Sequence, residues 1–140
     1  MEKVLGDMHA HLCFGVDDGP QEETEVRRLV NLAAASGTTH LWVTPHVIEP
    51  SNAPAWQQIL QQVDRLRNYV RDNGLQLELY PGAEVYMNPD LLEFLGADGA
   101  YCLNGGRYIL VELPMDQMPN YADDFWYELR LRGLRPVIAH

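Results

Sequence analysis

Apolar positions along the chain follow two different periods, and these periods predict alternating strands and helices. Short apolar or β-branched runs predict five strands, the first of them buried, at 4–9, 39–44, 75–80, 108–113 and 135–139. Longer segments with apolar residues at helical spacing predict helices at 22–36, 55–73 and 122–131, and a short helix at 89–95. Strands that alternate with helices indicate an α/β protein with parallel strands and right-handed crossovers.

Each predicted strand ends close to a residue that is able to bind a metal ion. In parallel α/β folds, functional residues gather at the carboxyl ends of the strands. The residues at these ends are His9 and His11, His46, Glu84, Glu112 and His140. Side chains alternate between the faces of a strand, so His9 and His11 are expected to project the same way. His40 lies at a strand start, on the opposite rim, and is expected to be structural.

Imidazole and carboxylate ligands suit Zn, Mn or Fe, and a set without thiolates favours an open catalytic site over a closed structural zinc site. Taken singly, each residue has a simpler explanation, as a hydrogen-bonded histidine or an ion-paired glutamate. Glu112 lies within an apolar strand, where a charge is costly unless it is paired or bound to a cation. The strand-end pattern as a whole favours metal binding.

Three aspartates lie close to the first histidines in the sequence. Asp7 is expected to hold a ligand in place or to face solvent. Asp17 and Asp18 belong to the glycine-rich turn Gly15–Pro20. They are expected either to form the turn or to line the mouth of the site.

Composition narrows the function classes. A chain of 140 residues is one domain in size, and 10 Lys and Arg against 20 Asp and Glu give a net charge of −10, which argues against a nucleic-acid partner. No segment approaches the roughly 20 apolar residues of a membrane span, and no signal peptide is visible. Cys13 and Cys102 stand alone, as expected for buried thiols in a reducing compartment, so the expected location is cytoplasmic.

Six motifs occur in a fixed order: Asp-Met-His-Ala-His, Gly-Val-Asp-Asp-Gly-Pro, Thr-Pro-His, Pro-Gly-Ala-Glu, Leu-Asn-Gly-Gly-Arg-Tyr-Ile-Leu-Val-Glu-Leu and Pro-Val-Ile-Ala-His. Over nearly the whole chain this series resembles the polymerase and histidinol phosphatase (PHP) superfamily, and within it the CpsB-like bacterial tyrosine-protein phosphatases. The resemblance implies an incomplete PHP-type distorted (β/α)7 barrel with about five parallel strands. Residues 1–140 would form the N-terminal part of a single PHP-like domain, without its C-terminal portion, which carries a phosphate-binding arginine and further ligands.

The resemblance also implies a cluster of up to three divalent cations, manganese first, with iron or zinc as alternatives. By this resemblance, His9 and His11 would bind the first cation. Glu112 and His140 would bind a second, and Glu84 would bridge these two cations. His46 would bind the third. The implied activity is hydrolysis of phosphotyrosine by metal-activated water. The implied substrate is a bacterial tyrosine autokinase that drives capsule or exopolysaccharide synthesis. Neither cysteine begins a C-x5-R loop, so cysteine-based phosphatase chemistry is not expected.

Two alternatives stay open at this point. The first is a PHP phosphatase for a small metabolite such as histidinol phosphate. The second is a catalytically incompetent metal-binding fragment. About five strands do not close a seven-stranded barrel, so an open sheet edge leaves room for association with another chain, including a second copy.

Overall fold

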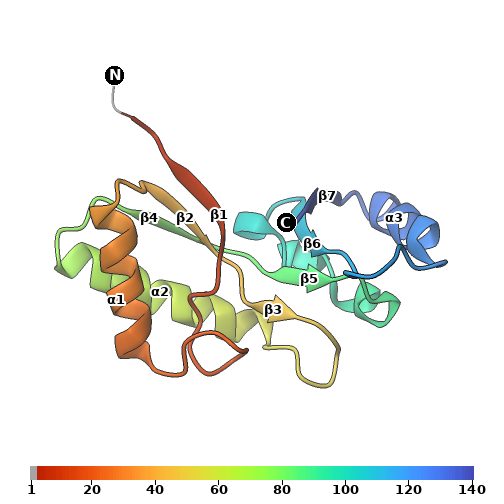
Figure 1. Ribbon diagram of the computed structural model, residues 1–140, viewed down its shortest axis with the longest axis horizontal. Coiled ribbons are helices and arrows are strands. Elements are labelled where there is room, and N and C mark those ends of the chain that lie inside the picture. Colours follow the sequence, from red (N-terminus) through yellow and green to blue (C-terminus); the bar gives the residue numbers. More distant parts are fainter. Residues whose placement is uncertain (1–2) are drawn as a thin grey trace.

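The computed structural model describes residues 3–140 and shows parallel strands joined by helices (Figure 1). The α-helices are α1 (Glu23–Ala35), α2 (Trp56–Asp72) and α3 (Ala122–Leu131), and the 3-10 helices are η1 (Pro89–Phe94), η2 (Ala97–Gly99) and η3 (Leu103–Gly105). The strands are β1 (Gly6–Ala10), β2 (His40–Val43), β3 (His46–Val47), β4 (Glu78–Pro81), β5 (Glu84–Tyr86), β6 (Tyr108–Glu112) and β7 (Arg135–Ile138). Within residues 3–140, no helix is both long and apolar enough to cross a membrane.

The strands form two parallel sheets, with the orders β1-β2-β4 and β3-β5-β6-β7. Seven short strands replace the five expected ones, because β3 and β5 form additional strands just after the expected strands at 39–44 and 75–80. Pro45, which has no backbone N–H to donate, separates β2 from β3. Gly82 separates β4 from β5, and a Cβ at this position would lie 2.9 Å from Cδ2 of Leu103 and 3.2 Å from Cγ2 of Thr44. At both breaks the chain passes from one sheet into the other.

One main hydrophobic core joins the helices to the sheets. Leu41 and Val43 of β2 belong to it, and α1, α2 and α3 contribute Val26, Val30, Ile59, Val63, Phe125 and Leu129. These side chains recur at helical spacing, so each helix turns one apolar face inward. Burial of each large apolar side chain contributes about 1.5–3 kcal/mol. The core therefore gives the strand ends a rigid support.

A second, smaller set of contacts lies on the alternate positions of the strands. Trp42 of β2 stacks on Tyr80 of β4, with their ring centroids 4.6 Å apart. Leu103, Leu110 and Ala139 form a separate small cluster against which Trp42 also packs. Alternation along β2 thus sends Leu41 and Val43 to the main core and Trp42 the other way.

The helix predictions agree with the structure to within about one residue at each end, which is the usual uncertainty of a helix boundary. The prediction of a buried first strand at 4–9 is wrong. Val4 and Leu5 precede β1 and are 71% and 43% exposed, and residues 6–8 of β1 are exposed as well. β1 pairs with β2 alone among the described strands, and an edge strand gains less burial than a central one.

Candidate metal centre

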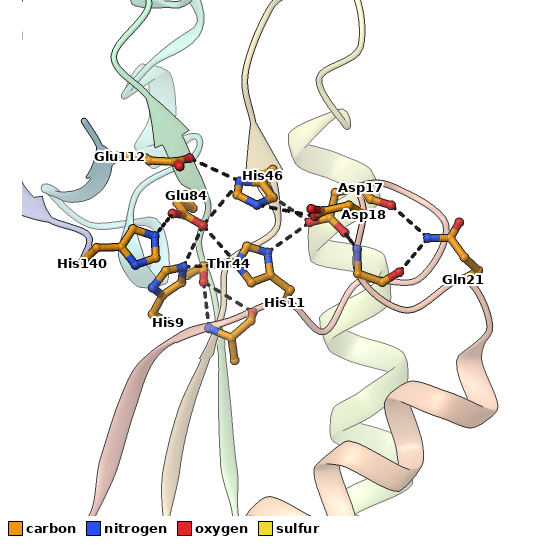
Figure 2. Close-up of polar contacts among 12 residues, drawn as sticks. His9, His11, Asp17, Asp18, Gln21, Thr44, His46, Glu84, Glu112 and His140 are labelled. Carbon is orange, nitrogen blue, oxygen red and sulfur yellow. Dashed lines mark hydrogen bonds and ion pairs between the residues drawn. The ribbon is translucent and has the colours of Figure 1, made fainter. Parts of the chain in front are cut away.

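The six histidines and glutamates singled out in the sequence lie together where the two sheets meet (Figure 2). Their places in the chain explain why they meet. His9 lies in β1 and His11 just after it. His46 is the first residue of β3, and Glu84 is the first residue of β5. Glu112 ends β6, and His140 follows β7. Register places His46 beside Glu84 across the β3–β5 pair. The breaks between β2 and β3 and between β4 and β5 thus bring His46 and Glu84 to the same place as the ends of β1, β6 and β7.

Glu84 lies at the centre of this group and is completely buried. Its Oε2 is 2.7 Å from Nε2 of His9 and 3.0 Å from Nε2 of His11. Its Oε1 is 3.1 Å from Nε2 of His140. From the sequence, Glu112 was the clearest case of a charge within an apolar strand, but the Glu112 side chain is 21% exposed. A fully buried anion is costly unless it is paired or bound, so Glu84 is the residue that requires the surrounding imidazoles.

His46 supplies the observation that tests whether these residues fit a cation. Its Nδ1 is buried and has no hydrogen-bond partner among the described residues. The same atom lies 3.4 Å from Oε2 of Glu84 and 3.6 Å from Oε2 of Glu112. Ligand atoms about 2.0–2.2 Å from a shared metal lie no more than about 4.4 Å apart. A cation between these three atoms would satisfy the nitrogen and both oxygens, so the residues fit.

Two groups of side chains have ligand atoms within 4.8 Å of one another: His9, His11 and Glu84, and then His46, Glu84 and Glu112. Glu84 belongs to both, as a bridging carboxylate would. This grouping differs from the distribution implied by the family resemblance, which gave His46 to a third cation. The side chain of His140 is 65% exposed and approaches only the second oxygen of Glu84. The distribution of ligands among cations stays a prediction.

Asp17 is buried beside His11 and His46, although its turn position allowed it to be only a turn former or to line the site mouth. Its carboxylate is only 4% exposed, lies 3.2 Å from Nδ1 of His11 and accepts the backbone N–H groups of His46 and Gly19, both at 2.9 Å. Burial alone would raise its pKa, but the hydrogen bonds from His11, His46 and Gly19 outweigh burial and lower the pKa to about 2. An ionised Asp17 orients the His11 ring so that Nε2 faces Glu84.

His11 responds to the same neighbours. The hydrogen bond with Asp17 raises the pKa of the imidazole, burial opposes this change, and the nearby charge of Glu84 adds to it. Without a cation, these carboxylates favour a proton on the ring. A cation would have to displace that proton, as metals do when they bind histidine.

The remaining aspartates and His40 lie outside this inner group. Asp18 is at the site mouth: its carboxylate is 85% exposed, and Oδ1 lies 3.6 Å from Nε2 of His46. The carboxylate of Asp7 accepts the backbone N–H of His9 at 3.1 Å, so it supports the backbone of a candidate metal ligand. His40 contacts Thr39 and stacks on Tyr80, away from the cluster.

Thr44 and Gln62 hold the loops around the site and were not predicted from the sequence. Thr44 is fully buried, and its Oγ1 accepts the N–H of Ala10 at 3.0 Å, which fixes the end of β1 between His9 and His11. Gln62 is buried on the inner face of α2, where it hydrogen-bonds the backbone of Phe14. A polar residue on a face otherwise formed by Ile59, Val63 and Leu66 was the available signal for Gln62.

Both cysteines are buried, as the sequence predicted. Burial raises the pKa of the Cys13 thiol to about 12 and that of Cys102 to about 11. Such thiols stay protonated near neutral pH and are poor nucleophiles. The chemistry of this site therefore rests on imidazoles and carboxylates.

The fold and the cluster define a class: an α/β protein with a candidate multi-cation centre where its two parallel sheets meet. Residues 5–140 match the family model described as capsular polysaccharide synthesis, CpsB/CapC. The chain belongs to this family.

Relatives and a solved structure agree with this assignment. The chain is 30% identical over 134 residues to CapC of Staphylococcus aureus, covering 96% of this chain and 52% of CapC. It is 30% identical over 136 residues to the tyrosine-protein phosphatase YwqE of Bacillus subtilis, and the match covers 96% of this chain and 53% of YwqE. A crystal structure from work on YwqE and Streptococcus pneumoniae CpsB, described there as unique metal-dependent tyrosine phosphatases, superimposes with a TM-score of 0.86 at 28% identity and covers 97% of this chain and 55% of that one. The chain spans about half the length of the relatives it matches.

Proposed function

We propose that this chain carries the metal centre of a phosphotyrosine phosphatase and hydrolyses phosphotyrosine. The observation that carries the proposal is the convergence of four imidazoles on the buried carboxylate of Glu84. Membership of the CpsB/CapC family supports the same assignment, because relatives in it are named tyrosine-protein phosphatases. The proposed substrate is a phosphotyrosine protein, in particular a bacterial tyrosine autokinase of capsule or exopolysaccharide synthesis.

The proposed ligands are the six strand-end residues His9, His11, His46, Glu84, Glu112 and His140. Mixed nitrogen and oxygen ligation suits Mn²⁺, which we take as the first candidate, and also Fe or Zn. Divalent cations in such a site activate water for attack and neutralise charge on a phosphate group. Asp18, which faces the outer nitrogen of His46, is close enough to take part on the solvent side.

The residues of this chain would contribute position and charge. Asp17 holds His11 through Nδ1 and the backbone of His46 through its N–H, so both rings are oriented before a ligand arrives. Glu84 fixes the distance between the two ligand groups because one carboxylate belongs to both. The ring of His140 contacts the second oxygen of Glu84 from the end of β7.

Phosphotyrosine hydrolysis is tested with the 140-residue chain and Mn²⁺, by phosphate release from a phosphotyrosine peptide. Activity that is removed by chelation and by Glu84→Ala, but retained in the surface variant Glu25→Ala, is the expected result. Preference for histidinol phosphate would favour the metabolite phosphatase. Cation binding without release of phosphate from either substrate would favour a catalytically incompetent metal-binding fragment and contradict the proposal for this chain.

We also propose a fold for the whole domain. The parallel strands and the likeness to the YwqE and CpsB structures support an incomplete, distorted (β/α)7 barrel. Residues 1–140 would be the N-terminal part of its single domain. A cytoplasmic location and association through the open sheet edges stay predictions from the sequence.

A further inference from the structure

A small cavity opens directly beside the candidate metal centre. It has a volume of about 290 Å³ and is lined by Val16, Asp17, Asp18, His46, Ile48 and Asn52. His46 belongs to both places: Nδ1 faces Glu84 and Glu112, whereas Nε2 faces Asp18 on the cavity side (Figure 2). A group bound at the cluster would therefore extend into this cavity past a single imidazole ring.

The cavity has two aliphatic walls. Val16 comes from the loop between β1 and α1 and is half-buried. Ile48 directly follows β3 and is 45% exposed. Two polar groups of the lining already have partners. The Asp17 carboxylate contacts His11 and accepts the backbone N–H groups of Gly19 and His46, and the Asn52 amide donates to the Glu49 carboxylate at 3.1 Å. The surface left for a ligand is therefore apolar on two sides, with the Asp18 carboxylate at the rim.

Both walls are held in place before any ligand binds. The backbone carbonyl of Ile48 accepts the side-chain amide of Asn88 at 3.0 Å. Farther along the same loop, the carbonyl of Pro54 accepts the hydroxyl of buried Tyr101 at 2.9 Å. The loop that carries Val16 is fixed at Phe14 by Gln62. A cavity built on such anchored backbone keeps its shape, and a preformed shape favours selection between ligands.

We propose that Val16 and Ile48 hold the aromatic ring of an aryl phosphate whose phosphate lies at the cluster, and that they set a preference for aryl over alkyl phosphates. This inference rests on the proposed phosphatase function. In an aryl phosphate the ester oxygen joins the ring directly to phosphorus, so the ring must lie next to the cluster. Ring faces are apolar and ring edges carry partial positive charge, which matches two aliphatic walls and a carboxylate rim.

Size supports a single ring. Small-ligand pockets have volumes of about 300–1,000 Å³, so this cavity is at the lower limit of that range. A phosphoserine side chain places one methylene between its ester oxygen and the peptide, and would leave both walls largely uncovered. The difference in covered apolar area is the physical origin of the expected preference.

The chain contains four isoleucines, and this number makes a direct test simple: Ile48, Ile59, Ile109 and Ile138. Isoleucine δ1-methyl groups are labelled for NMR, the chain is loaded with diamagnetic Zn²⁺, and phenylphosphonate or methylphosphonate is added. The signal of Ile48, assigned with Ile48→Val, is expected to shift with phenylphosphonate through the ring current and to change much less with methylphosphonate. Ile138, with 48% exposure against 45% for Ile48, is the matched control and is expected to respond equally to both.

Each outcome decides the inference. If both phosphonates bind and Ile48 responds equally to them, the ring does not occupy the cavity and the inference is wrong, while the proposed phosphatase site stands. If neither phosphonate changes any methyl signal, both the inference and the phosphate site fail. If phenylphosphonate shifts Ile48 but no substrate is hydrolysed, the ring site stands and the proposed activity fails.

Steady-state kinetics provide an independent test if the chain hydrolyses these substrates. Ile48→Ser is expected to raise KM for p-nitrophenyl phosphate about tenfold, the smallest effect typical of a lost hydrophobic contact in a pocket, and to leave KM for a phosphoserine peptide within about twofold. The control Leu32→Ser changes an aliphatic residue of α1 with 63% exposure and is expected to change neither value. Equal changes for both substrates in Ile48→Ser would overturn the assignment of Ile48 as a specificity residue.

Discussion

Gln62 hydrogen-bonds both backbone groups of Phe14: its Oε1 accepts the Phe14 N–H at 2.8 Å, and its Nε2 donates to the Phe14 carbonyl at 3.0 Å. One side chain of α2 thereby replaces a strand partner for the loop that carries Asp17. Gln62 is itself buried, so neither Phe14 group has water as a ready substitute.

Gln62→Leu is therefore expected to destabilise the protein by about 1–3 kcal/mol, because it leaves a backbone donor and a backbone acceptor without partners. Urea unfolding followed by circular dichroism measures this change. Gln61→Leu, at the neighbouring exposed position, is the control and should stay within about 0.5 kcal/mol of the parent chain. Equal stability of the two variants would show that the pair does not stabilise the loop.

Glu84→Gln is expected to weaken cation binding by more than about 100-fold, since replacing a group that only supports a metal ligand already costs 10–100-fold. The substitution keeps the shape of the side chain but removes the charge that both ligand groups share. Isothermal titration with Mn²⁺ gives the affinity. Glu25→Gln on the exposed surface of α1 should bind as the parent does. An unchanged affinity in Glu84→Gln would place the cation elsewhere.

Addition and removal of the cation should change stability reversibly. A cation that binds only the folded chain stabilises it by about 2.7 kcal/mol at a concentration of 100 times its Kd. Differential scanning calorimetry is expected to show a higher Tm with Mn²⁺ and a return to the starting value with EDTA. A Tm that is independent of Mn²⁺, Fe²⁺ and Zn²⁺ would contradict a metal centre in this chain.

The two thiols should be unreactive in the folded protein. Because burial raises the pKa of Cys13 to about 12 and of Cys102 to about 11, both remain protonated at pH 8, and alkylation by iodoacetamide is expected only after unfolding. Because both pKa values are raised in the folded state, the stability that the protonated thiols contribute is fully present below about pH 9. It is lost as the pH rises toward 11 for Cys102 and toward 12 for Cys13. Fast labelling of native protein at pH 8 would contradict their burial.

Much of this architecture could be predicted from the sequence, because hydrophobic period and strand-end chemistry are local signals. The helices and the convergence of His9, Glu84 and His140 in one cluster follow from these signals. The strands β3 and β5, which resume after Pro45 and Gly82, could not be predicted, since they form by pairing with segments far apart in sequence. Nor could the burial of Glu84 over Glu112 be predicted, because both lie on inner strands of the four-stranded sheet. Glu84 is covered by four imidazole rings that come from distant segments, whereas Glu112 contacts one.

The breaks at Pro45 and Gly82 also have a mechanical meaning. His9 belongs to the three-stranded sheet, whereas Glu84 and Glu112 belong to the four-stranded one, so the cluster straddles the seam between them. A cation held by His9 and Glu84 would act as a cross-link between the two sheets. The ion would then hold the scaffold together as well as serve the chemistry.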